Sequence, residues 1–427
     1  GDNAASARRR RARGRLPGGR GKDLRAHRAP RKAASGLVAG GGAEYPAGGT
    51  GREAAMALGY GLIGTGFMGK THALAMRAVS AVMGDVAAPR LELLCDTPKA
   101  QAEARAAQFG FARATDDWRA LVADPAVDLV SITTPNSLHR EMALAALAAG
   151  KHVWCEKPMA LTLAEGREMA EAADAAGCAT LVGYNYIHNP AVLHAQALIA
   201  GGRIGRPVHF RGWVDEDYQA DPDLPWTWRA RLADAGLGAL GDLGCHLVSL
   251  ALGLMGPIES LVADTQIVHA TRALPDASGR AAVENEDTAT ALVRFASGAQ
   301  GSLSASRTAW GRKNRLDFEV HGTRGTICFA QERMNELQLY VNEGPKAEQG
   351  FRTILTSPEH PPFGAFVPAP GHQLGFGDLK TVEAGVLLRS IAGGPAAYPA
   401  FSDALGIEAV IHGIAESARE DRRVRFD

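Results

Sequence analysis

Three glycines near the start of the chain have the spacing of a loop that binds dinucleotide phosphates. Gly64, Gly66 and Gly69 form a Gly-x-Gly-x-x-Gly pattern that follows a short apolar run and opens a helical pattern. Gly64 would permit a tight turn after a strand, Gly66 would let the backbone approach a pyrophosphate, and Gly69 would allow close packing of the helix. The helix N-terminus would offer unpaired N–H groups to the phosphates. The pattern predicts a dinucleotide-binding fold.

An acidic residue after the next predicted strand indicates which dinucleotide would bind. Asp96 directly follows the apolar run 91–95. A carboxylate there would hydrogen-bond the adenosine ribose hydroxyls and repel a 2′-phosphate, which favours NAD over NADP. The interval from Gly69 to Asp96 is longer than the general spacing of about 20 residues, so we interpret residues 84–90 as a loop insertion. The alternative for Asp96 is a solvated turn residue.

Two further motifs are expected at the edge of the sheet where open parallel sheets bind ligands. Residues 133–136 (Thr-Thr-Pro-Asn) and 156–158 (Glu-Lys-Pro) each come at the end of a predicted strand. A lysine held between a strand end and a proline can approach a cofactor in a fixed geometry. The alternative for Lys157 is an ordinary surface lysine, which is the commonest situation for this residue type.

Asp242 and His246 are four residues apart and could share one face of a helix. Dehydrogenation needs a base for the hydroxyl proton, which histidine supplies near neutral pH, and a cation to steady the developing carbonyl oxygen. An Asp-x-x-x-His pair is also a common structural pair on helices. The spacing alone therefore leaves a catalytic and a structural interpretation open.

The elements that would position these residues change in character along the chain. From Tyr60 onward, short apolar runs alternate with helical patterns, which predicts a parallel sheet with right-handed crossovers. Its strands are expected at 91–95, 128–133, 152–155 and 179–183. After about Tyr184 the chain has longer alternating segments, which predict a largely antiparallel sheet. These segments are 208–216, 289–295, 301–307 and 316–321, some of them separated by turn signals at 297–298 and 322–325.

Composition limits the class of protein. With 427 residues, 46% of them hydrophobic and 22% charged, the chain can form two domains with full cores. The five cysteines are scattered singly, which suggests neither a zinc cluster nor a disulfide framework, and a reducing cytoplasm fits best. No His, Cys or carboxylate cluster has metal-ligand spacing. The apolar stretch 247–255 is too short to span a bilayer, so we expect no membrane segment.

The first 55 residues differ from the rest in charge. They carry 13 Lys or Arg residues against 4 Asp or Glu residues, whereas residues 56–427 carry 33 against 42. This basic extension could be a nucleic-acid-binding tail, a targeting peptide, or sequence upstream of the true start, because Met56 is the first methionine. It lacks the apolar region of a secretory signal, and the body lacks other nucleic-acid-binding features. We favour the third interpretation, in which residues 1–55 are disordered and not part of the native chain.

Taken together, several motifs resemble those of the Gfo/Idh/MocA oxidoreductase family, which includes glucose-fructose oxidoreductase and inositol dehydrogenase. The motifs are the glycine pattern, 156–158, 183–186 (Gly-Tyr-Asn-Tyr) with 189–190 (Asn-Pro), and 241–242 (Gly-Asp) with His246, and the resemblance covers about 58–425. It implies that Lys157 polarises the reacting oxygen, His246 acts as general acid or base, and Asp242 orients its neighbours. It also implies a cis Lys157-Pro158 bond. Many members have an acid where this chain has Ser249, so a secondary contact is missing there.

The resemblance also implies further binding residues. Residues 215–218, 220–222 and 225–229 resemble the branch of sugar and cyclitol dehydrogenases that contains levoglucosan dehydrogenase, and aromatic rings would suit the flat face of a sugar. The alternative is that Trp226 and Trp228 only pack the loop. The implied cofactor contacts are Gly64, Gly66, Phe67, Met68, Gly69, Asp96, Thr134, Pro135, Asn136, His139, Glu156 and Lys157. The implied substrate contacts are Lys157, Tyr184, Asn185, Trp228, Arg229, Asp242, His246 and His372.

We therefore expect an α/β protein with an N-terminal Rossmann domain at 57–182 and a C-terminal α/β domain at 183–425 that has an open, mainly antiparallel sheet. The resemblance also implies that the open face of this sheet forms the contact between subunits of a homodimer or homotetramer. The expected function is a cytoplasmic NAD-dependent dehydrogenase acting on a secondary hydroxyl of a sugar, anhydrosugar or inositol, with no metal and no nucleic-acid or membrane partner. The alternatives are a glycoside hydrolase that retains NAD and uses transient oxidation, and a non-catalytic NAD or sugar sensor.

Overall fold

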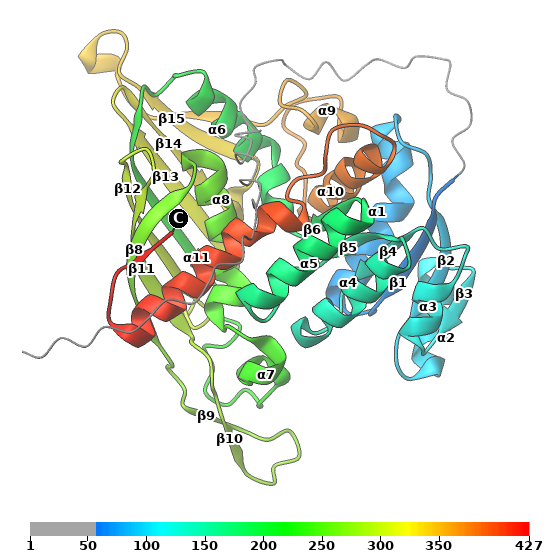
Figure 1. Ribbon diagram of the computed structural model, residues 1–427. Coiled ribbons are helices and arrows are strands. Elements are labelled where there is room, and N and C mark those ends of the chain that lie inside the picture. Colours follow the sequence, from blue (N-terminus) through cyan, green and yellow to red (C-terminus); the bar gives the residue numbers. More distant parts are fainter. Residues whose placement is uncertain (1–56, 427) are drawn as a thin grey trace, which may run out of the picture. The chain divides into compact units, whose positions relative to one another are not determined.

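The structure is a computed structural model that describes residues 57–426 (Figure 1). The prediction of a disordered extension at residues 1–55 therefore lies outside the described residues. The described part of the chain contains two large sheets with helices between and around them.

The first sheet has six parallel strands in the order β3-β2-β1-β4-β5-β6. Chain order reverses between β1 and β4, and open parallel sheets bind ligands in the crevice at such a reversal. The predicted strands are present, with ends that differ by at most one residue. The strands are β1 (Gly59–Ile63), β2 (Arg90–Cys95), β3 (Arg113–Thr115), β4 (Leu129–Ile132), β5 (His152–Cys155) and β6 (Thr180–Val182).

Helices follow the strands of this sheet, and local sequence signals mark several of their ends. Helix α1 ends at Gly84, which has φ 72° and begins the predicted loop before β2. Helix α5 begins with a capping box, in which Thr162 and Glu165 satisfy each other's backbone N–H groups. The helices are α1 (Phe67–Met83), α2 (Lys99–Phe109), α3 (Trp118–Ala123), α4 (His139–Ala148) and α5 (Leu163–Ala176).

The second sheet has nine strands in the order β16-β15-β14-β13-β7-β12-β11-β8-β17. Only the β7–β12 pair is parallel in it, which confirms the mainly antiparallel sheet expected from the sequence. A separate hairpin consists of β9 (Thr271–Ala273) and β10 (Arg280–Ala282). The sheet strands are β7 (Pro207–Asp215), β8 (Ile258–Gln266), β11 (Thr288–Phe295), β12 (Gln300–Ser306), β13 (Arg315–Gly322), β14 (Gly325–Ala330), β15 (Glu336–Val341), β16 (Arg352–Leu355) and β17 (Val424–Arg425).

Helices α6 (Pro190–Ala200), α8 (Cys245–Met255) and α11 (Phe401–Glu420) lie along one face of the second sheet, toward the first sheet (Figure 1). The short helices α7 (Leu232–Ala235) and α9 (Phe363–Phe366) lie in loops. The stretch Leu232–Met255 is long and apolar enough to cross a membrane, but 78% of its most apolar window is buried in the protein. Core helices of globular proteins also meet this length and composition test, so the finding is weak.

Helix α10 (Phe376–Ile391) comes late in the chain and packs against α1 (Figure 1). Its buried residues Ala384, Leu387 and Leu388 share one core with residues of β1 and α1 such as Leu62 and Val79. The strand β6 is also contacted by late residues, since the N–H of Val182 bonds to the carbonyl of Pro399. A segment near the C-terminus therefore completes the packing around the first sheet.

Candidate active site

A cavity of about 660 Å³ lies at the carboxyl ends of β1, β2, β4 and β5 and is closed on its far side by residues that follow β7. It brings together residues of both sheets' connecting segments. Among the residues predicted to bind cofactor or substrate, those that line it are Gly64, Gly66, Phe67, Met68, Asp96, Thr134, Pro135, Asn136, Glu156, Lys157, Trp228, Arg229 and Asp242.

The glycine loop has the geometry that a dinucleotide requires. Gly64 has φ 92°, and a Cβ atom there would lie 2.8 Å from the carbonyl oxygen of Thr133. A Cβ on Gly69 would lie 2.2 Å from the carbonyl oxygen of Gly64. Gly66 has open space around it, because no atom lies within 4 Å of such a Cβ. Helix α1 begins next to this space with no side-chain cap, so its N–H groups could receive phosphate oxygens. The loop fits an NAD pyrophosphate.

Asp96 follows β2 at the edge of the cavity. Its carboxylate accepts hydrogen bonds from the hydroxyl of Thr65, the N–H of Thr97 at 2.7 Å and the amide of Gln101 at 3.1 Å. These contacts fix the carboxylate while leaving it beside the open cavity. A carboxylate has about four acceptor positions, so it can still accept a ribose hydroxyl.

Lys157 and Asp242 form an ion pair across the cavity. The Lys157 Nζ lies 3.0 Å from Asp242 Oδ1 and 2.7 Å from the Asp242 carbonyl oxygen. The Lys157-Pro158 bond is cis, as the family resemblance implies. Burial lowers the pKa of Lys157, but the charge of Asp242 outweighs it and leaves that pKa above its ordinary value. Lys157 is therefore a fixed cation at neutral pH.

Asp242 also contacts side chains other than Lys157. The hydroxyl of Tyr218 donates to its Oδ2 at 2.6 Å, and the Arg229 Nε lies 3.6 Å from the same oxygen. Burial raises the pKa of Asp242, but the charges of Lys157 and Arg229 lower it by more than burial raises it. The pKa of Asp242 therefore lies well below the usual range. Tyr218 was not among the predicted site residues, although it lies in a segment that carries the family resemblance.

Asp242 lies in a π-helical turn, η4 (Leu240–Gly244), which runs directly into α8. The N–H of Cys245 bonds to the carbonyl of Leu240, five residues earlier. Asp242 and His246 thus lie on one continuous helical segment, but in turns of different pitch. Single π turns inside helices are frequent at functional sites, because they change the direction of one side chain relative to the next.

His246 is buried, with 7% of its surface exposed. The ring of Tyr186 packs against it with centroids 4.7 Å apart, and Tyr184 meets it edge-on at 5.8 Å. Burial and the nearby Lys157 hold the pKa of His246 well below its ordinary value. Its Nδ1 has no hydrogen-bond partner among residues 57–426. A neutral imidazole with a free ring nitrogen can accept a proton.

The structure places other predicted residues away from the cavity. His139 is buried, and its ring nitrogens lie 2.9 Å from the Pro158 carbonyl oxygen and 3.1 Å from that of Thr134, so it joins the two strand-end motifs from beneath. Asn185 is buried beside the tyrosines, in the short helix η2 (Asn185–His188). His372 is exposed in the loop before α10 and does not line the cavity.

A buried charge cluster beneath the cavity was missed by sequence reasoning. Glu156 Oε1 lies 2.6 Å from the Lys380 Nζ and 2.8 Å from the His72 Nε2. Lys380 also pairs with Glu383 at 2.7 Å. Burial raises the pKa of Glu156, but Lys380 more than offsets it and the pKa lies below its usual value. Lys380 is 224 residues from Glu156 in the chain, so no local spacing could indicate this contact.

Two family models match the chain. The model described as "Oxidoreductase family, NAD-binding Rossmann fold" matches residues 58–184, and the GFO/IDH/MocA C-terminal domain matches residues 192–328. Levoglucosan dehydrogenase of Pseudarthrobacter phenanthrenivorans is 39% identical over 378 residues, which are 85% of this chain and 97% of that protein. The scyllo-inositol 2-dehydrogenase (NAD(+)) of Bacillus subtilis is 29% identical over 287 residues, which are 66% and 77% of the two chains.

Solved structures agree with these matches. An NAD binding oxidoreductase from Klebsiella pneumoniae is 43% identical, with a TM-score of 0.83 over 86% of this chain and 99% of that one. A levoglucosan dehydrogenase in complex with NADH and L-sorbose is 38% identical, with a TM-score of 0.85 over 87% and 99% of the two chains. With both halves of the fold and the cavity accounted for, the chain belongs to the Gfo/Idh/MocA family of oxidoreductases, whose N-terminal half is an NAD-binding Rossmann fold.

Proposed function

We propose that the protein is an NAD-dependent dehydrogenase that oxidises a secondary hydroxyl of a sugar, anhydrosugar or inositol. The observation that carries the proposal is the Lys157–Asp242 ion pair at one end of a cavity whose other end is the glycine loop. His246 lies four residues beyond Asp242 on the same helical segment, and its lowered pKa keeps the imidazole neutral. A cation for the oxygen and a neutral base are the two groups that alcohol oxidation needs from the protein.

Different residues would bind the cofactor, stabilise the reacting oxygen and accept the proton. When bound, NAD supplies the carbon that accepts the hydride. The glycine loop and the N-terminus of α1 would hold its phosphates, and Asp96 its adenosine ribose. The Lys157 ammonium would donate a hydrogen bond to the reacting oxygen and stabilise negative charge on it. His246 would accept the hydroxyl proton, and Asp242 would keep the ammonium in place.

The relatives support a polyol as the substrate class. One is named a levoglucosan dehydrogenase, and its structures include complexes with NADH and either levoglucosan or L-sorbose. Another is named a scyllo-inositol 2-dehydrogenase. In this chain Trp228 and Arg229 line the same cavity as Lys157, so an aromatic face and a hydrogen-bond donor are available for a ring with several hydroxyls.

The finer assignments belong to the same proposal. Asp96 favours NAD over NADP, because a 2′-phosphate beside a fixed carboxylate would be repelled. We further propose that the enzyme acts in the cytoplasm as a homodimer or homotetramer formed through the outer face of the second sheet. The named relatives give no support to the NAD-retaining hydrolase or the sensor.

The test follows NADH formation by its near-ultraviolet absorbance, with the full chain, NAD or NADP, and a panel of anhydrosugars, aldoses and inositols. We expect turnover with NAD and one of these compound classes. An enzyme that binds NAD tightly, shown by calorimetry, but forms no NADH with any member of the panel would contradict the proposal.

A further inference from the structure

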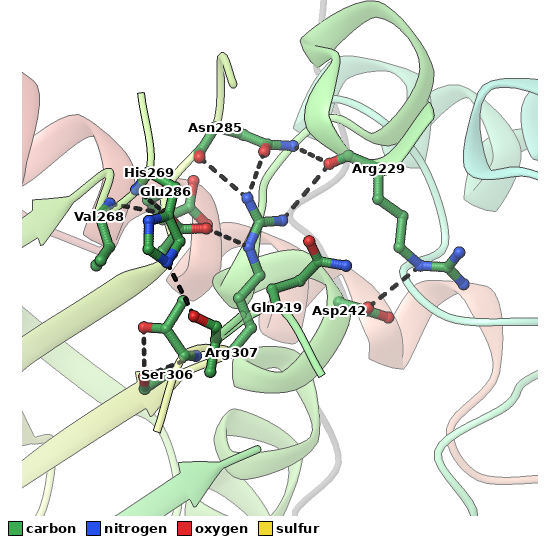
Figure 2. Close-up of polar contacts among 12 residues, drawn as sticks. Gln219, Arg229, Asp242, Val268, His269, Asn285, Glu286, Ser306 and Arg307 are labelled. Carbon is green, nitrogen blue, oxygen red and sulfur yellow. Dashed lines mark hydrogen bonds and ion pairs between the residues drawn. The ribbon is translucent and has the colours of Figure 1, made fainter. Parts of the chain in front are cut away.

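Three adjacent polar residues, Asn285, Glu286 and Asp287, are buried in the loop that enters β11 (Figure 2). Their exposed fractions are 2%, 9% and 1%. Burying polar and charged side chains is costly unless each finds partners. Each of the three finds partners on a different segment around the cavity, and none of them lines the cavity itself.

Asn285 holds the segment that carries Arg229. Its Nδ2 donates to the carbonyl of Arg229 at 2.9 Å and to the carbonyl of Gly236 at 3.1 Å. These two carbonyls stand at the two ends of a stretch that contains α7 and most of the short helix η3 (Trp228–Ala230). One side-chain amide therefore closes this stretch, the substrate loop (residues 229–236), into a fixed shape.

Asp287 supports Asn285 through Arg307. Asp287 Oδ1 and the Arg307 Nε lie 2.7 Å apart, and the Arg307 side chain is only 3% exposed (Figure 2). The Arg307 Nη2 donates to Asn285 Oδ1 at 2.9 Å. Because Oδ1 accepts from Arg307, the amide of Asn285 is oriented with its NH2 group toward the Arg229 and Gly236 carbonyls.

Glu286 holds the start of the turn that carries Asp242. Its Oε1 accepts from the N–H of Leu240 at 2.9 Å, and its carbonyl accepts from the N–H of Ala239 at 2.8 Å. Leu240 is the first residue of η4 and Ala239 directly precedes it, so both N–H groups lie at the start of the helix, where backbone donors have no partner within it. The position of the π turn is thereby tied to the same loop that holds the substrate loop.

The contacts made by Asn285 and those made by Glu286 both bear on the carboxylate of Asp242. The guanidinium of Arg229 lies over the ring of Trp228 at 4.5 Å. The Arg229 Nε is 3.6 Å from Asp242 Oδ2 (Figure 2). Arg229 reaches this place from the backbone that Asn285 holds, and Asp242 from the turn that Glu286 holds. A change in either anchor would alter the distance between the substrate loop and the ion pair with Lys157.

We infer that Asn285-Glu286-Asp287, together with Arg307, is a positioning element that sets the substrate loop and the Asp242 turn in register. Within it, Asn285 controls sugar binding through Arg229, and Glu286 controls turnover through Asp242. This inference rests on the proposed dehydrogenase function for its kinetic consequences, but its structural claim stands on the contacts above.

The kinetic test compares Asn285→Ala, Arg229→Ala and the double variant. Loss of the two donated hydrogen bonds should raise the KM for the sugar about ten-fold, with kcat and the NAD dissociation constant little changed. If Asn285 acts through Arg229, the double variant has the KM of Arg229→Ala alone. Additive effects of the two substitutions, or a KM for Asn285→Ala equal to that of the wild type, would overturn the inference.

Glu286 is tested by a conservative rescue. Glu286→Ala should lower kcat about ten-fold at nearly constant sugar KM, because the N–H of Leu240, at the start of the Asp242 turn, loses its side-chain acceptor. Glu286→Gln keeps an acceptor oxygen and should retain most of the turnover. Equal losses in the two variants would contradict the assigned role.

Ser417→Ala is the matched control. Ser417, on α11, is also buried and does not line the cavity. Its hydroxyl accepts a hydrogen bond from the N–H of Ala263 on β8 and donates one to the carbonyl of Arg422, just after α11. It should lower stability without changing KM or kcat. A rise in sugar KM in this variant similar to that in Asn285→Ala would show that general loosening explains both.

Hydrogen–deuterium exchange separates this inference from the proposed function. In Asn285→Ala, amides of residues 229–236 should exchange several-fold faster, while those of α5 stay at the wild-type rate. If the wild type forms no NADH with any sugar, the proposed function fails, and the exchange result still decides the positioning role. Wild-type exchange rates across the substrate loop in Asn285→Ala would overturn it.

Discussion

The two walls of the cavity are built in different ways. The cofactor wall consists of backbone turns at strand ends, and its glycine spacing alone determines where the ligand's phosphates can approach. The substrate wall consists of loops that have no regular spacing, and side chains from residues next to the ends of distant strands hold them in place. Each wall has a buried ion pair behind it, Glu156–Lys380 in one and Asp287–Arg307 in the other.

The ion pairs differ in what they touch. Glu156 is among the residues that line the cavity, on the side where we propose that NAD binds. Asp287 and Arg307 do not line that cavity, and they act through backbone carbonyls and N–H groups. The comparison indicates that changes behind the cofactor wall alter NAD binding, whereas changes behind the substrate wall alter sugar binding.

The largest effect is expected where the two walls meet. Lys157→Ala should cut turnover by roughly 10²–10⁴-fold, because the reacting oxygen would lose the ammonium that stabilises its negative charge. NAD should still bind, since the glycine loop is unchanged. Steady-state kinetics and calorimetry measure the two effects, and Lys346→Ala, on an exposed loop, serves as control. Retained turnover would remove Lys157 from the mechanism.

Removing the cation from each buried pair tests the comparison itself. Lys380→Met and Arg307→Met each leave a buried carboxylate unpaired and should lower the free energy of unfolding by about 3–5 kcal/mol. Urea unfolding measures this loss. Lys380→Met should also weaken NAD binding, because Glu156 faces the cavity, while Arg307→Met should leave the NAD dissociation constant near that of the wild type. Equal effects on NAD would abolish the distinction between the walls.

The glycine loop separates folding from ligand approach within one wall. Gly66→Ala adds a Cβ into open space, so stability should change by less than about 0.5 kcal/mol while NAD binding weakens about ten-fold or more, because the pyrophosphate must approach this backbone. Gly64→Ala should destabilise the fold, given its φ of 92° and the nearby Thr133 carbonyl. Thermal unfolding with and without NAD distinguishes the two. Unchanged NAD affinity in Gly66→Ala would contradict the loop's role.

The smallest effect concerns the carboxyl group of Glu216, which lies near Asp242. Burial and the charge of Asp242 raise the pKa of Glu216 from 4.5 to about 7, and no described residue forms an ion pair with it. The folded protein therefore binds more protons than the unfolded chain between these pH values, so Glu216 reduces stability as pH rises through that window. Glu216→Gln should gain stability relative to the wild type at pH 8 but not at pH 4.

Melting temperatures of the two proteins across this range measure the difference. Glu216 lies just beyond β7, two residues before Tyr218, which contacts Asp242. Glu156 gives the opposite sign, because Lys380 holds its pKa below the usual value. A difference in stability that does not change with pH would show that Glu216 titrates normally.

The cofactor wall could be predicted from the sequence because its signals are local. The turn at Gly64, the acid at Asp96 and the lysine at Lys157 each follow a strand that its own apolar run indicates. The strand ends were correct to within one residue, for example Leu129–Ile132 against the expected 128–133. Parallel topology then brings these strand ends to one edge of the sheet.

The supporting side chains could not be predicted, because their partners are distant in the chain. Asn285 and the Arg229 carbonyl are 56 residues apart. Which asparagine meets which loop depends on the order of strands in the second sheet. The contact of His372 with substrate stays a prediction. Its glycine-rich surroundings resembled a segment that returns to the cleft, yet the structure leaves its side chain exposed and away from the cavity.

Helix α10 has a consequence for how the protein is made. It packs with β1 and α1 in one core, although it is synthesised after most of the second sheet. While the ribosome is still translating that sheet, the nascent first half exposes the apolar surface that Leu387 and Leu388 will later cover. Its buried charge cluster can also form only after Lys380 has been synthesised, because Lys380 is the ion-pair partner of Glu156. The NAD-binding half therefore completes its core late in synthesis, although it emerges first.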